Sequence, residues 1–236
     1  QGYLFPNYSL PQTVLDEIRI KHSNLVKEYP EFRDNCPDLL NFDKSFLKYA
    51  LNGKILKMVA QLIGPDILLW NMSFFAKPAL NGKKTPWHQD GQYWPINPLA
   101  TCTVWIAIDD ATPQNGCMRF LPGSHKKKQI MQHIQRDNKN YTLQQELQPH
   151  EYNEKQAINV SLKAGSISFH DVYLIHGSEV NLSKKPRRGM TLRLMPASSH
   201  YDRSYAAQIA KERGDYDGTD RHIFLVHGED KYRKNK

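Results

Sequence analysis

Cysteine is scarce in this sequence, and its spacing excludes two common kinds of small domain. The 236 residues contain three cysteines, Cys36, Cys102 and Cys117, and no two of them form a Cys-x-x-Cys pair. A zinc ribbon is therefore not expected, and an odd, sparse set does not suit a disulfide framework. The set indicates a reducing, intracellular compartment. We expect a cytoplasmic location, with organelle targeting left open, and buried side chains at Cys102 and Cys117.

Long apolar runs are also lacking. No stretch approaches the roughly 20 apolar residues that cross a bilayer, so no membrane partner is expected. The first six residues lack the apolar core of a signal peptide. With 39% hydrophobic residues, 24% charged residues and no low-complexity tract, the composition is that of a globular chain.

Acidic residues are outnumbered by basic ones, which gives a formal net charge of +8. The basic residues form short clusters at 126–128, 184–188 and 231–236, without the aromatic-interleaved stripe that is typical of nucleic-acid binding. We therefore expect no nucleic-acid partner. A nucleic-acid demethylase is kept as the minor alternative because the pI is about 9.3. The excess charge favours a small anionic ligand.

Apolar periodicity predicts helices at the front of the chain and strands behind them. Helical spacing is found at about residues 10–28, 43–51 and 54–63, and a further helix is expected at 201–213, before a basic tail without chemistry. Apolar or alternating segments predict strands at residues 67–76, 101–109, 117–121, 158–162, 166–169 and 189–195.

Short strands separated by Gly/Pro turns, with helices at the front, predict a mainly β protein with helical support. A β-sandwich or jelly roll is the expected architecture, in a single domain over residues 1–236. Its parts would be helical support at about 10–63, a core at about 64–196 and a C-terminal segment at 197–236.

The polar stretch at residues 126–158 is the longest segment without a clear element. Long loops in compact domains tend to be lids or binding loops, so we expect substrate specificity to reside here. Its histidines, His133 and His150, are expected at the surface, and His125 is expected to be a loop residue with local hydrogen bonds.

One stretch carries a candidate metal site. His88 and Asp90 are separated by one residue, and on an extended strand such residues point to the same face. His170 and His176 lie together further along the chain. We choose His176 as the third ligand, with His170 as a neighbour, because Gly177 gives it space and Ser178 places a hydroxyl beside it. Two histidines and one carboxylate, with other positions open, are the ligand set of non-haem Fe(II) oxygenases.

Other residues allow two interpretations each. Asn71 lies in an apolar strand and must be hydrogen-bonded there, either to backbone or to a ligand. Trp105 lies on the more polar face of its strand, where it either packs in the core or lines a pocket. The aromatic residues around the candidate metal site, Trp87, Tyr93 and Trp94, line a pocket or fill a core.

Several fragments, in order and with similar spacing, resemble the phytanoyl-CoA dioxygenase family of Fe(II)/2-oxoglutarate oxygenases. The resemblance runs from about residue 64 to 196 and rests on these fragments: Gly64-Pro65-Asp66-Ile67, Lys77-Pro78, Gly82-Lys83-Lys84-Thr85, His88-Gln89-Asp90, Asn115-Gly116-Cys117, Leu121-Pro122-Gly123-Ser124-His125 and His176-Gly177-Ser178. It implies a double-stranded β-helix, the jelly roll of cupin-like proteins.

The resemblance also assigns roles. It places Fe(II) on His88, Asp90 and His176, with no catalytic residue beyond these ligands. The arginine for the distal carboxylate of 2-oxoglutarate falls at Arg187, with Arg188 and Arg193 as the alternatives. Other cosubstrate contacts would be Ser178, Asn71 and Trp105. We place the substrate pocket at Gln89, Tyr93, Trp94 and Arg193.

The implied reaction consumes O2 and 2-oxoglutarate, with ascorbate as an auxiliary reductant, and oxidises an unactivated C–H bond of a small, anionic metabolite. Hydroxylation is the expected outcome. The alternatives are oxidative cyclisation or desaturation of a secondary-metabolite acid at the same iron site. From another class, a non-catalytic metal-binding jelly roll is the alternative. The stretch at 126–158 departs from the family pattern, so the resemblance does not name the substrate.

Overall fold

The computed structural model describes residues 1–214 and 216–235. The chain divides into two compact units, each built from three stretches. The first unit comprises Gln1–Cys36, Phe74–Gln92 and Trp105–Met190, and the second comprises Pro37–Ser73, Tyr93–Val104 and Thr191–Lys236. The single domain expected over the whole chain stays a prediction.

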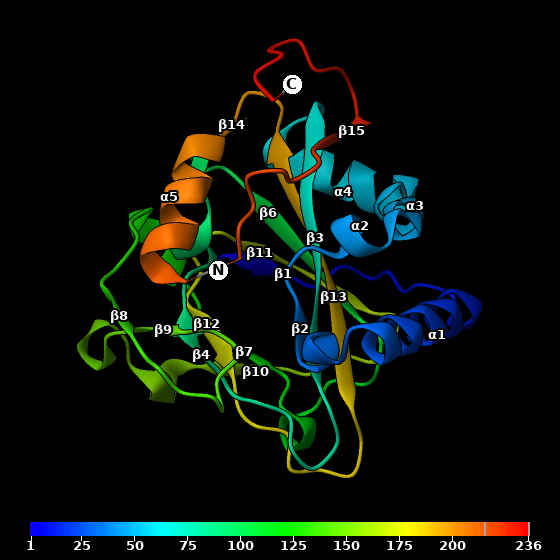
Figure 1. The fold of residues 1–236 in the computed structure, drawn as a ribbon, viewed down its shortest axis with the longest axis vertical. Helices are drawn as coiled ribbons and strands as arrows, with labels where there is room; N and C mark the ends of the chain where they lie inside the picture. Colours follow the sequence, from blue (N-terminus) through cyan, green and yellow to red (C-terminus); the bar gives the residue numbers. More distant parts are fainter. Residues whose placement is uncertain (215, 236) are drawn as a thin grey trace. The chain divides into compact units, whose positions relative to one another are not determined.

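The helices agree with the apolar periodicity, with one exception. Helix α1, Gln12–Glu28, belongs to the first unit (Figure 1) and turns Leu15, Ile18 and Leu25 inward. In the second unit, α4 spans Gly53–Ile63 and α5 spans Arg203–Arg213. The single helix expected at 43–51 is instead a short α2, Leu39–Phe42, a 3-10 turn and a short α3, Leu47–Ala50.

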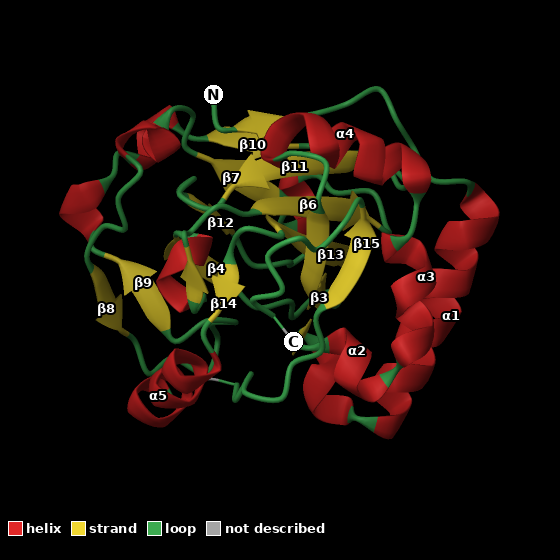
Figure 2. Ribbon diagram, turned by 90° about the horizontal axis from the view of Figure 1, so that it is seen from above, coloured by secondary structure: helices red, strands yellow, loops and turns green. Residues whose placement is uncertain are grey.

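Two antiparallel sheets form the core of the fold. The larger has the order β1 (Tyr3–Leu4), β11 (Ile167–Asp171), β6 (Cys102–Ala107), β13 (Arg187–Pro196), β3 (Ile67–Lys77) and β15 (Phe224–His227), with β2 (Asn35–Cys36) also on β3. The smaller lies wholly in the first unit, and Figure 2 shows its strands side by side: β10 (Ile158–Val160), β7 (Met118–Phe120), β12 (His176–Ser178) and β4 (Thr85–His88).

The chain passes repeatedly between these sheets. From β3 in the larger sheet it enters β4 in the smaller one, returns to β6 and crosses again to β7. The second half follows the same pattern from β10 through β11 and β12 to β13. This is the strand order of a jelly roll, so the predicted double-stranded β-helix with helical support is confirmed.

The core of the first unit explains why the two sheets stay together there. Side chains from β6, β7 and β10 meet in one apolar cluster that includes Trp105, Phe120 and Val160, and all three are buried. A second cluster lies under the smaller sheet and joins Trp87 of β4 to Leu147. Burial of these large apolar groups is the main favourable term for this packing.

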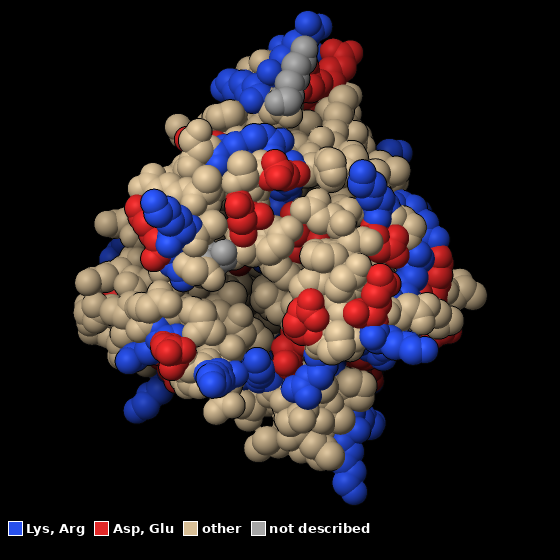
Figure 3. Space-filling model, viewed as in Figure 1, with Lys and Arg blue, Asp and Glu red and all other residues tan. Residues whose placement is uncertain are grey.

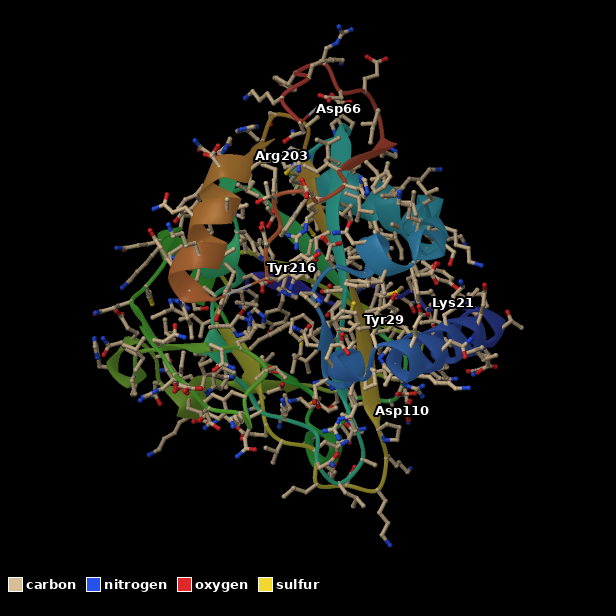
Figure 4. All side chains as sticks on the ribbon, viewed as in Figure 1. Lys21, Tyr29, Asp66, Asp110, Arg203 and Tyr216 are labelled. Carbon is tan, nitrogen blue, oxygen red and sulfur yellow. The ribbon has the colours of Figure 1, made fainter. Side chains whose placement is uncertain are left out.

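Loops in the first unit are tied together by side-chain to backbone contacts. Asp110, labelled in Figure 4, follows β6, and its Oδ1 accepts a hydrogen bond from the backbone N–H of Ala164 at 2.8 Å. That bond lowers the pKa of the Asp110 carboxyl. It connects the loop before β7 to the turn before β11.

Two segments for which the sequence predicted no strand contain strands in the structure. The stretch at 126–158 contains the hairpin β8 (His133–Gln135) and β9 (Gln145–Leu147), together with short 3-10 turns. The C-terminal segment contributes β15, whose Phe224 pairs with Leu69 of β3. The last two-stranded sheet pairs β14 (His200–Tyr201) with β5 (Ile96–Asn97). Strands of two to four residues carry too few alternating positions to be recognised in a sequence.

Cys36, Cys102 and Cys117 are all buried and free, as expected for the latter two. Among the described helices, none has both the length and the apolar character that a bilayer crossing requires. On the face shown in Figure 3, basic and acidic side chains are interspersed rather than gathered by sign.

Candidate metal centre

Three side chains of the first unit converge on one point. His88 is the last residue of β4 and lies opposite His176, the first residue of β12, while Asp90 opens the 3-10 turn that follows β4. One ligand atom from each residue lies within 4.8 Å of the other two. Asp90 Oδ1 is 3.6 Å from His88 Nε2 and 3.9 Å from His176 Nε2. All three side chains are buried.

Backbone carbonyls set the tautomer of both histidines. His88 Nδ1 is 2.8 Å from the carbonyl oxygen of Pro86, and His176 Nδ1 is 2.9 Å from that of Leu174. A carbonyl only accepts, so each Nδ1 carries a hydrogen and each Nε2 is the ring atom directed at Asp90. Burial, with a contribution from His88, holds the pKa of His176 well below its ordinary value. That ring is therefore neutral and ready to bind a cation.

The donor set fits a divalent first-row metal. Two imidazole nitrogens and one carboxylate oxygen face a common point, and the backbone contacts behind the rings fix their orientation. The route to this arrangement differs from the expectation. His88 and Asp90 do not share an extended strand, because β4 ends at His88 and the N–H of Gly91 donates to the carbonyl of Val172 at 3.2 Å. The 3-10 turn, rather than strand alternation, directs the carboxylate.

Arg187 is a buried cation without a carboxylate partner among the described residues. Its Nε donates to the carbonyl of Gly116 at 3.2 Å, and its Nη1 donates to that of Phe75 at 3.0 Å. Burial lowers the pKa of Arg187 to about 10. Arg188, by contrast, is already paired, because its Nε and Nη2 lie 2.7 Å and 2.8 Å from the two oxygens of Asp109. Of these two neighbouring arginines, only Arg187 lacks a carboxylate partner among the described residues, and its role in binding 2-oxoglutarate stays a prediction.

Trp105 supports this arginine from the core. The Arg187 guanidinium carbon lies 5.6 Å from the centre of the Trp105 ring, and the indole belongs to the apolar cluster of the first unit. The sequence left open whether Trp105 packs in the core or lines a pocket. The structure places it in the core, stacked against the guanidinium.

Gly189 is required for that stack. A Cβ at this position would lie 2.1 Å from Cζ2 of Trp105. Because a Cβ is bonded directly to the backbone, it cannot rotate away from the indole ring. We expect Gly189→Ala to lower the free energy of unfolding by about 1–3 kcal/mol through overpacking, as measured by chemical denaturation. The control is Gly53→Ala, which meets nothing within 4 Å at the start of α4 and should leave stability equal or slightly higher. Equal stability of the two variants would contradict the close contact.

Ser178 ends β12 and lies opposite Met118 of β7. Met118 is two residues beyond Gly116, whose carbonyl accepts from Arg187. The Ser178 side chain is buried. The geometry is compatible with the cosubstrate contact that the sequence predicted.

The remaining predicted site residues belong to the second unit. Asn71 is almost fully buried, donates to the carbonyl of Pro37 at 2.8 Å and accepts from Arg193 Nη1 at 2.9 Å. Arg193 also lies over Trp94, 5.0 Å from the ring centre. The expected partner of Asn71 is therefore found in the protein itself. Roles for Asn71, Tyr93, Trp94 and Arg193 in binding cosubstrate or substrate stay predictions.

Gln89, expected in the substrate pocket, is instead a structural residue. It is fully buried, and its Nε2 donates to the carbonyls of Gln129 at 3.0 Å and Tyr173 at 2.8 Å. Its Oε1 accepts from the N–H of Met131 at 2.8 Å. Since these contacts occupy both donors and the acceptor, the side chain fastens the turn between the metal-site residues to the segment at 129–131.

Removal of this amide should be costly. We expect Gln89→Ala to lower the free energy of unfolding by about 2–4 kcal/mol, since three buried hydrogen bonds are lost at roughly 0.5–1.5 kcal/mol each. Denaturant titration would measure the change. Gln129→Ala is the control, because residue 129 contributes its carbonyl and its side chain is exposed. A loss no larger than that of the control would contradict the role of the amide.

His133 was expected at the surface and is half-buried beside the metal centre. Its Nε2 accepts from the backbone N–H of Gln89 at 3.2 Å, and its Nδ1 donates to the carbonyl of Met131 at 2.8 Å. His150 is exposed, as expected. Sequence reasoning missed His133 because no local pattern signals a contact to a residue 44 positions away.

The segment that carries His133 also borders a cavity. Its volume is about 470 Å³, and its lining comes from residues 127 and 129–133 together with Gln92 and Glu151. Gln92 lies in the same 3-10 turn as Asp90. Most of the lining thus comes from the stretch at 126–158, whose binding role stays a prediction.

Comparison with known proteins was made on the whole chain. Residues 21–189 match the family model described as Phytanoyl-CoA dioxygenase (PhyH). The chain is 32% identical over 197 residues to "Phytanoyl-CoA dioxygenase, peroxisomal" of Homo sapiens, covering 80% of this chain and 56% of the relative. It is 33% identical over 129 residues to "Phytanoyl-CoA dioxygenase" of Arabidopsis thaliana, covering 55% and 44%. The chain thus spans about half the length of these curated relatives.

Solved structures share the fold at lower identity. The non-heme monooxygenase ThoJ, in its apo form, matches with a TM-score of 0.76 and 23% identity, over 97% of this chain and 81% of that one. The "non-heme alpha ketoglutarate dependent carbocyclase SnoK from nogalamycin biosynthesis" matches with a TM-score of 0.73 and 21% identity, over 97% and 90%. At these identities the likeness shows the fold alone.

Proposed function

The chain belongs to the phytanoyl-CoA dioxygenase family, and from this premise we propose that it is an Fe(II)- and 2-oxoglutarate-dependent dioxygenase. One observation carries the proposal: the Nε2 atoms of His88 and His176 face the same carboxylate oxygen of Asp90. Two imidazoles and one carboxylate leave other positions of a six-coordinate ferrous ion open.

Each residue of the site has one task in this proposal. His88, Asp90 and His176 hold the iron, which when bound supplies the activation of O2 that accompanies decarboxylation of 2-oxoglutarate to succinate and CO2. Arg187 binds the distal carboxylate of 2-oxoglutarate, for which its planar guanidinium offers parallel donors. Ser178 adds a hydroxyl. Trp105 and Gly189 keep the guanidinium in place.

The protein's further task is to aim a C–H bond of the substrate and to exclude water. We propose a small, anionic metabolite as the substrate, on the basis of the net charge of +8. The cavity bordered by the segment at 127–133 is the proposed place where substrates are selected. Hydroxylation is the proposed outcome, with cyclisation or desaturation as the alternative. A reducing, intracellular location is proposed because all three cysteines are buried and free.

The test is a 2-oxoglutarate-dependent succinate assay with purified protein, Fe(II), ascorbate and a panel of small organic acids. Mass spectrometry of the products separates gain of one oxygen from loss of two hydrogens. Because the fold is also shared with a structure described as a "non-heme alpha ketoglutarate dependent epimerase", a product of unchanged mass is included in the search. Succinate release that requires both iron and one of the acids supports the proposal.

A protein that binds iron but never consumes 2-oxoglutarate, alone or with any acid, would instead be a non-catalytic metal-binding jelly roll. The nucleic-acid demethylase alternative has a separate measurement. Binding to DNA that weakens with rising salt supports it, and the absence of such binding removes it.

A further inference from the structure

The second oxygen of Asp90 has its own partner, and that partner comes from the other sheet. His170 lies on β11 of the larger sheet, and its Nε2 is 3.3 Å from Asp90 Oδ2. The two oxygens of the carboxylate are thereby distinguished, because Oδ1 is the one nearer to His88 Nε2 and His176 Nε2. His170 is 3% exposed, so water does not compete freely for this contact.

We propose that His170 is a positioning residue that holds Asp90 for coordination through a single oxygen. This inference rests on the proposed function and assigns a role to a side chain outside the three ligands. A carboxylate that coordinates through one oxygen occupies one position of a metal ion, whereas a chelating carboxylate occupies two. Restraint of Oδ2 therefore preserves an open position, which a reaction with both 2-oxoglutarate and O2 requires.

The hydrogen-bond roles follow from the chemistry of the pair. An ionised carboxylate has no hydrogen to donate, so the contact requires the hydrogen on His170 Nε2. In the neutral ring, Nδ1 is then an acceptor, and this atom is buried without a hydrogen-bond partner in the described part of the chain. A buried acceptor without a partner costs free energy. The contact with Asp90 is the hydrogen bond of this ring that the structure shows, and it gives a reason for a histidine at this position.

Packing keeps the His170 ring in place. The ring of Phe120, fully buried on β7, has its centre 5.5 Å from that of His170 and 6.1 Å from that of His176. The His170 and His176 ring centres are 4.9 Å apart. Because aromatic neighbours surround it, a phenyl ring of similar size can replace the imidazole without a large cavity.

The experiment compares His170→Phe with His170→Gln. Phenylalanine keeps the ring volume and lacks the donor, while glutamine offers an amide N–H near the place of Nε2. Binding of Fe(II) under anaerobic conditions, and of Co(II), is measured by calorimetry on the full chain. We expect His170→Phe to weaken binding by roughly tenfold or more, the usual scale for loss of a partner behind a metal ligand, and His170→Gln to restore most of it.

Two further readouts separate positioning from support of the fold. The visible absorption of the Co(II)-loaded protein reports coordination number, and we expect it to differ between His170→Phe and wild type and to return in His170→Gln. Thermal unfolding of the metal-free protein should show His170→Phe close to wild type, because removal of the unpartnered Nδ1 offsets the loss of the hydrogen bond to Asp90.

Wild-type metal affinity and an unchanged Co(II) spectrum in His170→Phe would overturn the proposal. So would equal weakening in both variants with a lower unfolding temperature of the metal-free protein, which is the result of a purely structural role. The metal site itself is tested separately by His88→Ala. If that variant binds metal like wild type, the proposed function fails, whereas a defect in His88→Ala with none in His170→Phe removes only this inference.

Discussion

Replacement of Arg187 by glutamine is expected to raise the KM for 2-oxoglutarate by about 30-fold or more. Loss of one partner from a buried charge pair costs at least about 2 kcal/mol, which is about that factor in affinity. The effect is large here because Arg187 is buried, is held by two backbone carbonyls and has no carboxylate partner among the described residues. Succinate release as a function of 2-oxoglutarate concentration measures it.

Arg188 provides a matched control at the adjacent position. Its guanidinium is occupied by Asp109, so Arg188→Gln should lower stability by about 1 kcal/mol and leave the KM for 2-oxoglutarate unchanged. We thus expect Arg187→Gln to change the KM for 2-oxoglutarate and Arg188→Gln to change stability instead. If Arg188→Gln raised the KM and Arg187→Gln did not, the assignment of the cosubstrate arginine would be reversed.

Replacement of His176 by alanine is expected to abolish succinate release and to weaken Fe(II) binding by more than about 100-fold. Changes behind a ligand already cost roughly 10–100-fold, and here a ligand itself is lost. Anaerobic calorimetry with Fe(II), together with the succinate assay, measures both effects. His150→Ala is the control, since that histidine is exposed.

The control should bind iron like wild type. Full iron binding and full succinate release by His176→Ala would show that the three converging side chains do not form the metal site. The substitution removes the hydrogen bond from His176 Nδ1 to the carbonyl of Leu174, while the backbone pairing of β12 with β7 does not depend on the side chain.

The sequence predicted most of what depends on local patterns. The strands at residues 67–76 and 101–109 were found from their apolar and alternating residues, and the triad was found from the His-x-Asp spacing and the family's fragments. These signals are carried by neighbouring residues. The strand bounds differ from the structure by one or two residues at most.

Contacts between residues that are far apart in the chain could not be predicted from the sequence. The pairing of Arg188 with Asp109, which favours Arg187 as the cosubstrate arginine, joins residues 79 positions apart. The role of Gln89 is decided by Met131 and Tyr173, and no pattern around Gln89 indicates either contact. The turn that carries Asp90 was mistaken for a strand. The sequence separation of His88 and Asp90 is the same whether the chain continues as a strand or turns after His88, so the triplet does not distinguish the two.

The cross-strand register of the two histidines has a consequence for the apo protein. β4 has four residues and is an edge strand of the smaller sheet, where it pairs with β12. His88 of β4 lies directly opposite His176 of β12. An ion bound there links the two strands in addition to their backbone hydrogen bonds. At a free-ion concentration about 100 times the Kd, such binding adds about 2.7 kcal/mol to the folded state. We therefore expect that an ion bound by residues of both strands stabilises this edge of the sheet.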